Sequence, residues 1–215
     1  MAGRNMFDFD GPLMRFTNKA ISLIWLNILT IVCSLPVVTF GASFAAMHTV
    51  VLKMSRDNEG YITKEFFKAF KVNLGIGIKA SVAIILFVAI AMADFYAINL
   101  LDVWFADVAR VLLIMFVIFF VITVTFLFPI MAKFEAGFTD TVKNSFKFAA
   151  SHIFKTVAMF LLNITLWVLS YFFLFLSPLL FIWGFSLPAY LGTSLYGEEF
   201  KKIEEAYNKG GRTDV

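Results

Sequence analysis

Four long runs without a charged residue divide the sequence. They are 20–52, 80–93 (continuing past Asp94 to Leu101), 111–132 and 156–197. A helix needs about 20 apolar residues to cross a hydrocarbon core roughly 30 Å thick. Such runs indicate an integral membrane protein, because a chain of this length has too few polar residues to cover them in water.

The composition agrees with this interpretation. Of the 215 residues 60% are hydrophobic and only 15% are charged, whereas soluble domains have about 25% charged residues. The chain therefore cannot be a disordered, fibrous or disulfide-built protein, and its single cysteine, Cys33, cannot form an internal disulfide. We expect no nucleic-acid partner from the net charge of +3, because membrane topology explains the basic residues better.

The runs predict an all-α polytopic bundle of six spans in three helical hairpins, forming a single membrane domain with a short cytoplasmic tail at 198–215. The last run is divided near Ser177-Pro178, since proline interrupts helices. The first run is long for one span and short for two. It is either a hairpin turning at Ser34-Leu35-Pro36 or one span followed by a half-buried helix. The predicted spans are 17–35, 37–54, 74–98, 108–131, 155–176 and 178–197.

The basic residues favour six spans over five. Six spans place 17 of the 18 lysines and arginines on the side of both termini, and only Arg110 lies elsewhere; five spans leave 14 on that side. Cytoplasmic loops are enriched in lysine and arginine. We therefore predict a multi-pass protein of the cell membrane, surrounded by lipid, with both termini in the cytoplasm. A weak match of the chain to itself, which pairs Lys71 with Lys147 and Lys79 with Lys155, suggests that the hairpins are related.

Two amphipathic stretches, 62–72 and 138–148, are predicted to be helices on the cytoplasmic membrane surface. They either only position the spans or also dock a cytoplasmic partner. In the cytoplasmic loop before the last two spans, Glu135-Ala136-Gly137-x-x-Asp140 resembles the Glu-Ala-Ala loop with which ABC importer permeases dock their ATPase subunit, but it has Thr141 where a glycine is expected. The docking candidates are Lys64, Lys68, Lys71, Glu135 and Asp140.

Some uncharged residues within the spans are candidates for a binding site. Asn27 and Asn163 occupy equivalent positions in two of the proposed hairpins, and a helix broken at Pro36 can expose backbone groups to a solute. Most such residues instead form hydrogen bonds between helices. The binding candidates are Asn27, Pro36, Thr39, Gly41 and Asn163.

No pattern of residues predicts catalysis. His48, His152 and Cys33 are scattered, so we expect no metal site, and His48 is expected to be a packed or hydrogen-bonded helix residue. Gly75-Ile76-Gly77 lacks the third glycine of a nucleotide-binding loop. The sequence therefore predicts a protein that is not an enzyme and has no cofactor.

Several motifs resemble those of the YesL family of small bacterial membrane proteins. They are Asp10-Gly11-Pro12-Leu13, Asn27, Ser34-Leu35-Pro36-Val37-Val38-Thr39-Phe40-Gly41-Ala42, and Phe66-Phe67-Lys68-Ala69-Phe70-Lys71 with Asn73. Members are often encoded beside sugar-binding proteins, ABC importer permeases and glycoside hydrolases. The resemblance implies an accessory role in carbohydrate uptake with ABC sugar importer subunits. The alternative is a small permease or channel for a neutral solute; a homo-oligomer is compatible with both.

Overall fold

The computed structural model describes residues 12–56, 60–100, 106–172 and 184–210. Helices and short turns make up all of these ranges, and they contain no strand, which confirms the predicted all-α class. The helices are α1 (Pro12–Ser34), the 3-10 turn η1 (Val37–Thr39), α2 (Phe40–Ser55), α3 (Ile62–Leu100), α4 (Ala106–Lys133), α5 (Phe138–Ser151), α6 (Ile153–Phe172) and α8 (Ser186–Gly210).

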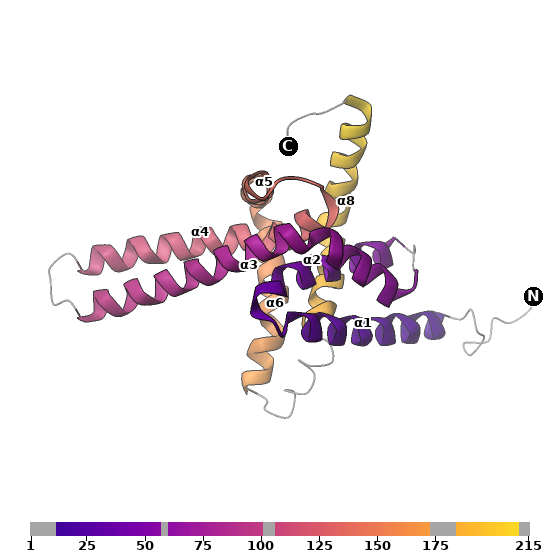
Figure 1. Cartoon of the computed structure of the whole chain (residues 1–215), viewed down its shortest axis with the longest axis horizontal. Helices are drawn as coiled ribbons and strands as arrows, with labels where there is room; N and C mark the ends of the chain where they lie inside the picture. Colours follow the sequence, from indigo (N-terminus) through magenta and orange to yellow (C-terminus); the bar gives the residue numbers. More distant parts are fainter. Residues whose placement is uncertain (1–11, 57–59, 101–105, 173–183, 211–215) are drawn as a thin grey trace, which may run out of the picture.

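Helix α2 is the centre of the fold. It contacts α1, α3, α4 and α8 (Figure 1), and 61% of the span Val37–Ser55 is buried, against 17% for the most apolar parts of α3 and α4. Its small residues allow neighbouring backbones to come close, as is usual where helices pack in membranes. Fully buried members of this set are Ala42, Ser43, Ala45 and Ala46.

The first charge-free run forms two helices. Helix α1 ends at Ser34, and η1 begins after Pro36, whose backbone has φ −70° and ψ 108°. Proline has no N–H to donate and disfavours the helical conformation in the residue before it, so the chain turns at this point. Both Phe16–Ser34 and Val37–Ser55 are long and apolar enough to cross a membrane, as the hairpin interpretation requires.

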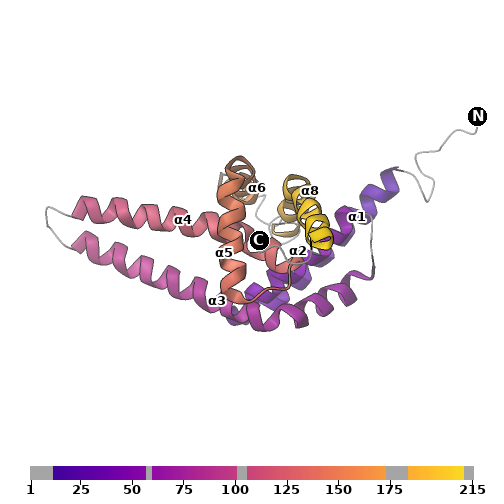
Figure 2. The same cartoon turned by 90° about the horizontal axis from the view of Figure 1, so that it is seen from above.

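Helices α3 and α4 form a long hairpin that projects from the rest of the molecule (Figures 1 and 2). With 39 residues, α3 is about 58 Å long, well over the thickness of a hydrocarbon core. It includes both the expected surface helix 62–72 and the predicted span 74–98, so the expectation of a separate surface helix is wrong. No proline lies between them, and Gly75 and Gly77 do not interrupt the helix.

The second amphipathic stretch does form a short helix, α5. Its buried residues, Thr141, Ser145, Phe148 and Ala149, recur at the spacing of one helix face. The chain then bends by 104° into α6. The prediction of a short amphipathic helix before the fifth span is therefore confirmed.

Helix α8 continues without a break from Ser186 to Gly210 and carries the predicted tail as far as that residue. Its Tyr196 and Phe200 pack against Phe126 of α4 and Phe148 of α5, with neighbouring ring centroids 4.9–6.0 Å apart. The predicted turn at Ser177-Pro178 lies outside the described residues.

The described helices support a membrane protein with several spans. Four of them are long and apolar enough to cross a membrane, and a fifth span is obtained if α5 and α6 are counted as one bent pair. In Figure 1 the α3–α4 hairpin runs across the direction of α6 and α8, so these helices do not form a simple parallel bundle. The six spans and the cytoplasmic position of the termini stay predictions.

Candidate functional site

Asn27 lies in the interior, where it holds the beginning of α8. Its side chain is fully buried, and its Oδ1 accepts hydrogen bonds from the backbone N–H groups of Phe185 (3.0 Å) and Ser186 (3.1 Å). The Ser186 hydroxyl donates in return to the carbonyl of Leu23 in α1 at 2.8 Å. The first N–H groups of a helix have no partner within the helix. Asn27 therefore caps a helix that begins far away in the sequence.

Pro36, Thr39 and Gly41 form the connection between α1 and α2. The Thr39 hydroxyl lies 2.8 Å from the carbonyl oxygens of Cys33 and Pro36 and closes the turn, whereas Pro36 itself is exposed. The Gly41 N–H donates to Ser81 Oγ of α3 at 2.9 Å. Thr39 and Gly41 thus have structural partners within the protein.

Gly41 and Gly77 allow an unusually close contact between α2 and α3. A Cβ atom on Gly41 would lie 2.4 Å from the carbonyl oxygen of Gly77, and one on Gly77 would lie 2.4 Å from the backbone nitrogen of Ala42. Real Cβ atoms do not approach backbone atoms so closely. Glycine is therefore required at both positions for the helices to pack as they do.

Asn163 lines a cavity of about 230 Å³ between α2, α4 and α6, named here the Asn163 cavity. Its Nδ2 donates to the carbonyl of Met159, one turn earlier in the same helix, at 2.7 Å. The lining is dominated by aromatic and aliphatic side chains, with Phe44, Phe128, Phe160 and Phe185 among them. Asn27 does not line this cavity, so the described residues do not bring the two asparagines together on one polar path.

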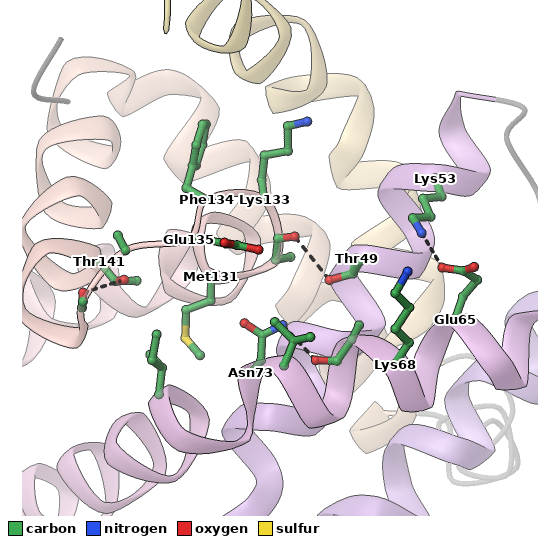
Figure 3. A pocket seen from close by; sticks show the side chains of 16 residues that line it. Thr49, Lys53, Glu65, Lys68, Asn73, Met131, Lys133, Phe134, Glu135 and Thr141 are labelled. Atoms are coloured by element: carbon green, nitrogen blue, oxygen red, sulfur yellow. Dashed lines mark hydrogen bonds and ion pairs between the residues drawn. The ribbon is translucent and has the colours of Figure 1, made fainter. Parts of the chain in front are cut away.

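A larger cavity, of about 570 Å³, lies where α2 and α4 end and the first turns of α3 pass (Figure 3). We name it the Lys68 cavity. Lys68 of α3 and Glu135 of the loop between α4 and α5 both line it, although they are far apart in the sequence. Two docking candidates chosen from separate segments therefore meet at one site. The other charged residues of its lining are Lys53, Glu65 and Lys133.

Ion pairs fix most of the charges around this cavity. Lys53 at the end of α2 forms a hydrogen-bonded ion pair with Glu65 of α3. Lys133 at the end of α4 pairs with Glu204 of α8 at 2.7 Å, and Arg56 lies 3.5 Å from the same carboxylate. The hydrogen bond from Lys133 holds the pKa of Glu204 below its ordinary value, and the positive charges of Lys133 and Arg56 add to this effect.

Lys68 and Glu135 differ from these neighbours. Neither forms an ion pair with another residue in the part of the chain that the structure describes, and both are exposed. Their charges are thus not fixed by an ion pair, although, after the hydrogen bond from Lys53, the charge of Lys68 also contributes to the lowered pKa of Glu65, one turn earlier in α3. The remaining docking candidates, Lys64, Lys71 and Asp140, are also exposed but lie outside the cavity lining.

The sequence did not single out some residues of the site as candidates. Lys53 and Lys133 stood out only as basic residues at span ends, and Asn73, which is buried beside the cavity, only as part of a family motif. The one sequence signal that could have indicated these three residues is their position at the ends of predicted spans. The partners Glu65 and Glu204 have no such signal, because their pairing depends on how the helices pack.

His48 is buried in α2, where its Nδ1 lies 3.3 Å from the Tyr196 hydroxyl of α8. This confirms the expectation of a packed, hydrogen-bonded residue. No group of three or more histidine, cysteine or carboxylate side chains able to hold a metal ion occurs in residues 12–56, 60–100, 106–172 and 184–210.

The fold and its long apolar helices define a polytopic helical membrane protein. Residues 23–95 match a family model described as "Protein of unknown function, DUF624", which covers about half of α1, all of α2 and most of α3. The matched segment contains most of the residues that carry the resemblance to small YesL-like membrane proteins. A search of curated proteins and a search of solved structures found no match to this chain.

Proposed function

We propose that the protein is a non-enzymatic membrane component that docks an ABC sugar importer during carbohydrate uptake. The observation that carries the proposal is the Lys68 cavity, where Lys68 and Glu135 meet with charges that no neighbour in the described residues pairs. Complementary charges fix the register of two surfaces and suppress wrong partners. The resemblance to the YesL family supports the choice of a sugar importer as the partner.

The surroundings of the cavity fit a docking role. Glu135 and Gly137 belong to the loop that resembles the ATPase-docking loop of importer permeases, and this loop forms one wall of the cavity. Lys64 and Lys71 on α3 and Asp140 on α5 extend the exposed charged surface around it. A partner that contacts this surface would meet residues of both segments at once.

A permease for a neutral solute has less support. Asn27 is occupied as a helix cap, and aromatic side chains surround Asn163. A solute that passes between them would have to displace Phe185, whose backbone N–H is bonded to Asn27. Flux of a broad panel of sugars into liposomes containing the purified protein would nevertheless favour the permease.

Affinity purification from detergent-solubilised membranes tests the docking proposal. The tagged wild type should retain importer subunits under sugar-inducing growth, and the double variant Lys68→Gln/Lys71→Gln should retain several-fold less. The control is Lys143→Gln/Lys147→Gln, which removes the same charge from exposed positions of α5. Absence of importer subunits from the wild-type sample, or equal losses in both double variants, would count against specific docking on α3.

A further inference from the structure

The Lys68 cavity has the two kinds of lining that an amphiphilic ligand requires. Its lining includes the charged residues Lys53, Lys68 and Glu135 as well as the apolar residues Val72 and Met131. Along α3 the charged turns come first and the apolar membrane segment follows, which is the order expected at a membrane interface. We propose that this cavity binds the headgroup phosphate of a membrane phospholipid, with Lys68 as its main ligand.

Lys68 is the lysine of this cavity whose charge is available. Lys53 is held by Glu65, and Lys133 by Glu204 at 2.7 Å. An ammonium group donates up to three hydrogen bonds and is a common phosphate ligand. With its two neighbours neutralised by carboxylates, Lys68 supplies the local positive charge that a phosphate needs.

The apolar part of the lining favours a lipid over a free phosphate as the ligand. Val72, which is 63% exposed, and Ile76 both line the cavity, and further apolar residues of α3, Val82 and Leu86 among them, are exposed beyond it. Acyl chains that follow this surface remove apolar area from water at the rim and keep the phosphate beside Lys68. A small phosphate compound gains nothing from this apolar lining.

Glu135 sets a further requirement on the headgroup. Its carboxylate accepts hydrogen bonds and repels phosphate, so it favours a phosphate beside Lys68 and a neutral group on its own side. The far end of the headgroup must therefore donate hydrogen bonds, as the hydroxyl groups of a glycerol do. This inference goes beyond the docking proposal and is tested separately from it, because lipid binding is measured on the purified protein without importer subunits.

Titrations of the purified full chain in detergent, read by native mass spectrometry, test the inference. The probes are dioctanoyl phosphatidylglycerol, dioctanoylglycerol without phosphate, and glycerol 3-phosphate without chains. We expect saturable binding of the phospholipid, at least about tenfold weaker binding of dioctanoylglycerol, and no saturable binding of glycerol 3-phosphate. Lys68→Gln should weaken phospholipid binding at least about tenfold, as expected for a lost charge-assisted hydrogen bond, and Lys68→Arg should retain it.

Lys64→Gln is the matched control, because Lys64 is exposed on the same helix but does not line the cavity. It should change phospholipid binding by less than about twofold, as exposed charges contribute little. Equal effects of Lys64→Gln and Lys68→Gln would overturn the site. Equal binding of dioctanoylglycerol and the phospholipid would overturn the role of phosphate, and tight binding of glycerol 3-phosphate would overturn the lipid as its source.

Discussion

Replacing Asn27 by alanine should destabilise the protein although no charge is lost. The side chain is fully buried, and its Oδ1 is the acceptor for two N–H groups at the beginning of α8, at 3.0 and 3.1 Å. A buried polar group left without a partner costs about 1–3 kcal/mol, and loss of a helix cap about 0.5–2 kcal/mol. For Asn27→Ala we therefore expect a loss of about 2–4 kcal/mol. That corresponds to a fall of the thermal midpoint by roughly 5–15 °C for a protein of this size.

Thermal unfolding of the purified protein in detergent, followed by circular dichroism, measures this effect. Asn163→Ala is the control, since the Asn163 amide bonds to the carbonyl of Met159 in its own helix. The control should lose less than about 1 kcal/mol, because the Met159 carbonyl keeps its backbone hydrogen bond within the helix when the Asn163 side chain is removed. Equal losses in the two variants, or a loss below about 1 kcal/mol for Asn27→Ala, would refute the capping role.

Other predictions concern the contact between α2 and α3 and the attachment of α8. Gly77→Ala should lower the thermal midpoint strongly, because its Cβ would lie 2.4 Å from the Ala42 nitrogen, whereas Gly75→Ala has no atom within 4 Å and should stabilise by about 0.5–1 kcal/mol. A smaller effect of Gly77→Ala than of Gly75→Ala would contradict the close contact. The ion pair of Glu204 with Lys133 should hold α8 to α4 above pH 4.5, the ordinary pKa of this carboxyl, and weaken as the pH falls through its lowered value in the folded protein. Spin-label distances between the end of α4 and the turn of α8 that carries Glu204 should lengthen over that acidic range in the wild type, and Glu204→Gln should show the longer distance at every pH, while Tyr196 and Phe200 keep the preceding turns packed.

The helical class and the break at Pro36 could be predicted from the sequence, because both depend on local properties. Apolar length identifies a span, and proline removes a backbone donor and so favours the end of a helix, although Pro129 remains inside α4. The continuity of α3 could not be predicted in this way. Its first turns are amphipathic and its later turns apolar, so the pattern changes near Asn73, yet nothing in the backbone stops the helix there.

The candidate site shows the same division between local and tertiary information. Lys68 and Glu135 could be chosen one by one from their charge and their place at the ends of spans. Their meeting in one cavity depends on how α3 packs beside the loop that follows α4. Asn27 was chosen as a binding candidate, with hydrogen bonding between helices as the alternative, and the structure shows such bonds. Its partners, Phe185 and Ser186, lie near the other end of the chain, and no sequence spacing reveals such a contact.

Photocrosslinking in sugar-induced cells tests the central proposal most directly. A photoreactive amino acid at position 135 would report on partners at the Lys68 cavity, and one at position 163 would report on the Asn163 cavity. The account predicts adducts with importer subunits from position 135 and none from position 163. Adducts from position 163 alone, or from neither position while the protein is normally expressed, would contradict docking at this end of the molecule.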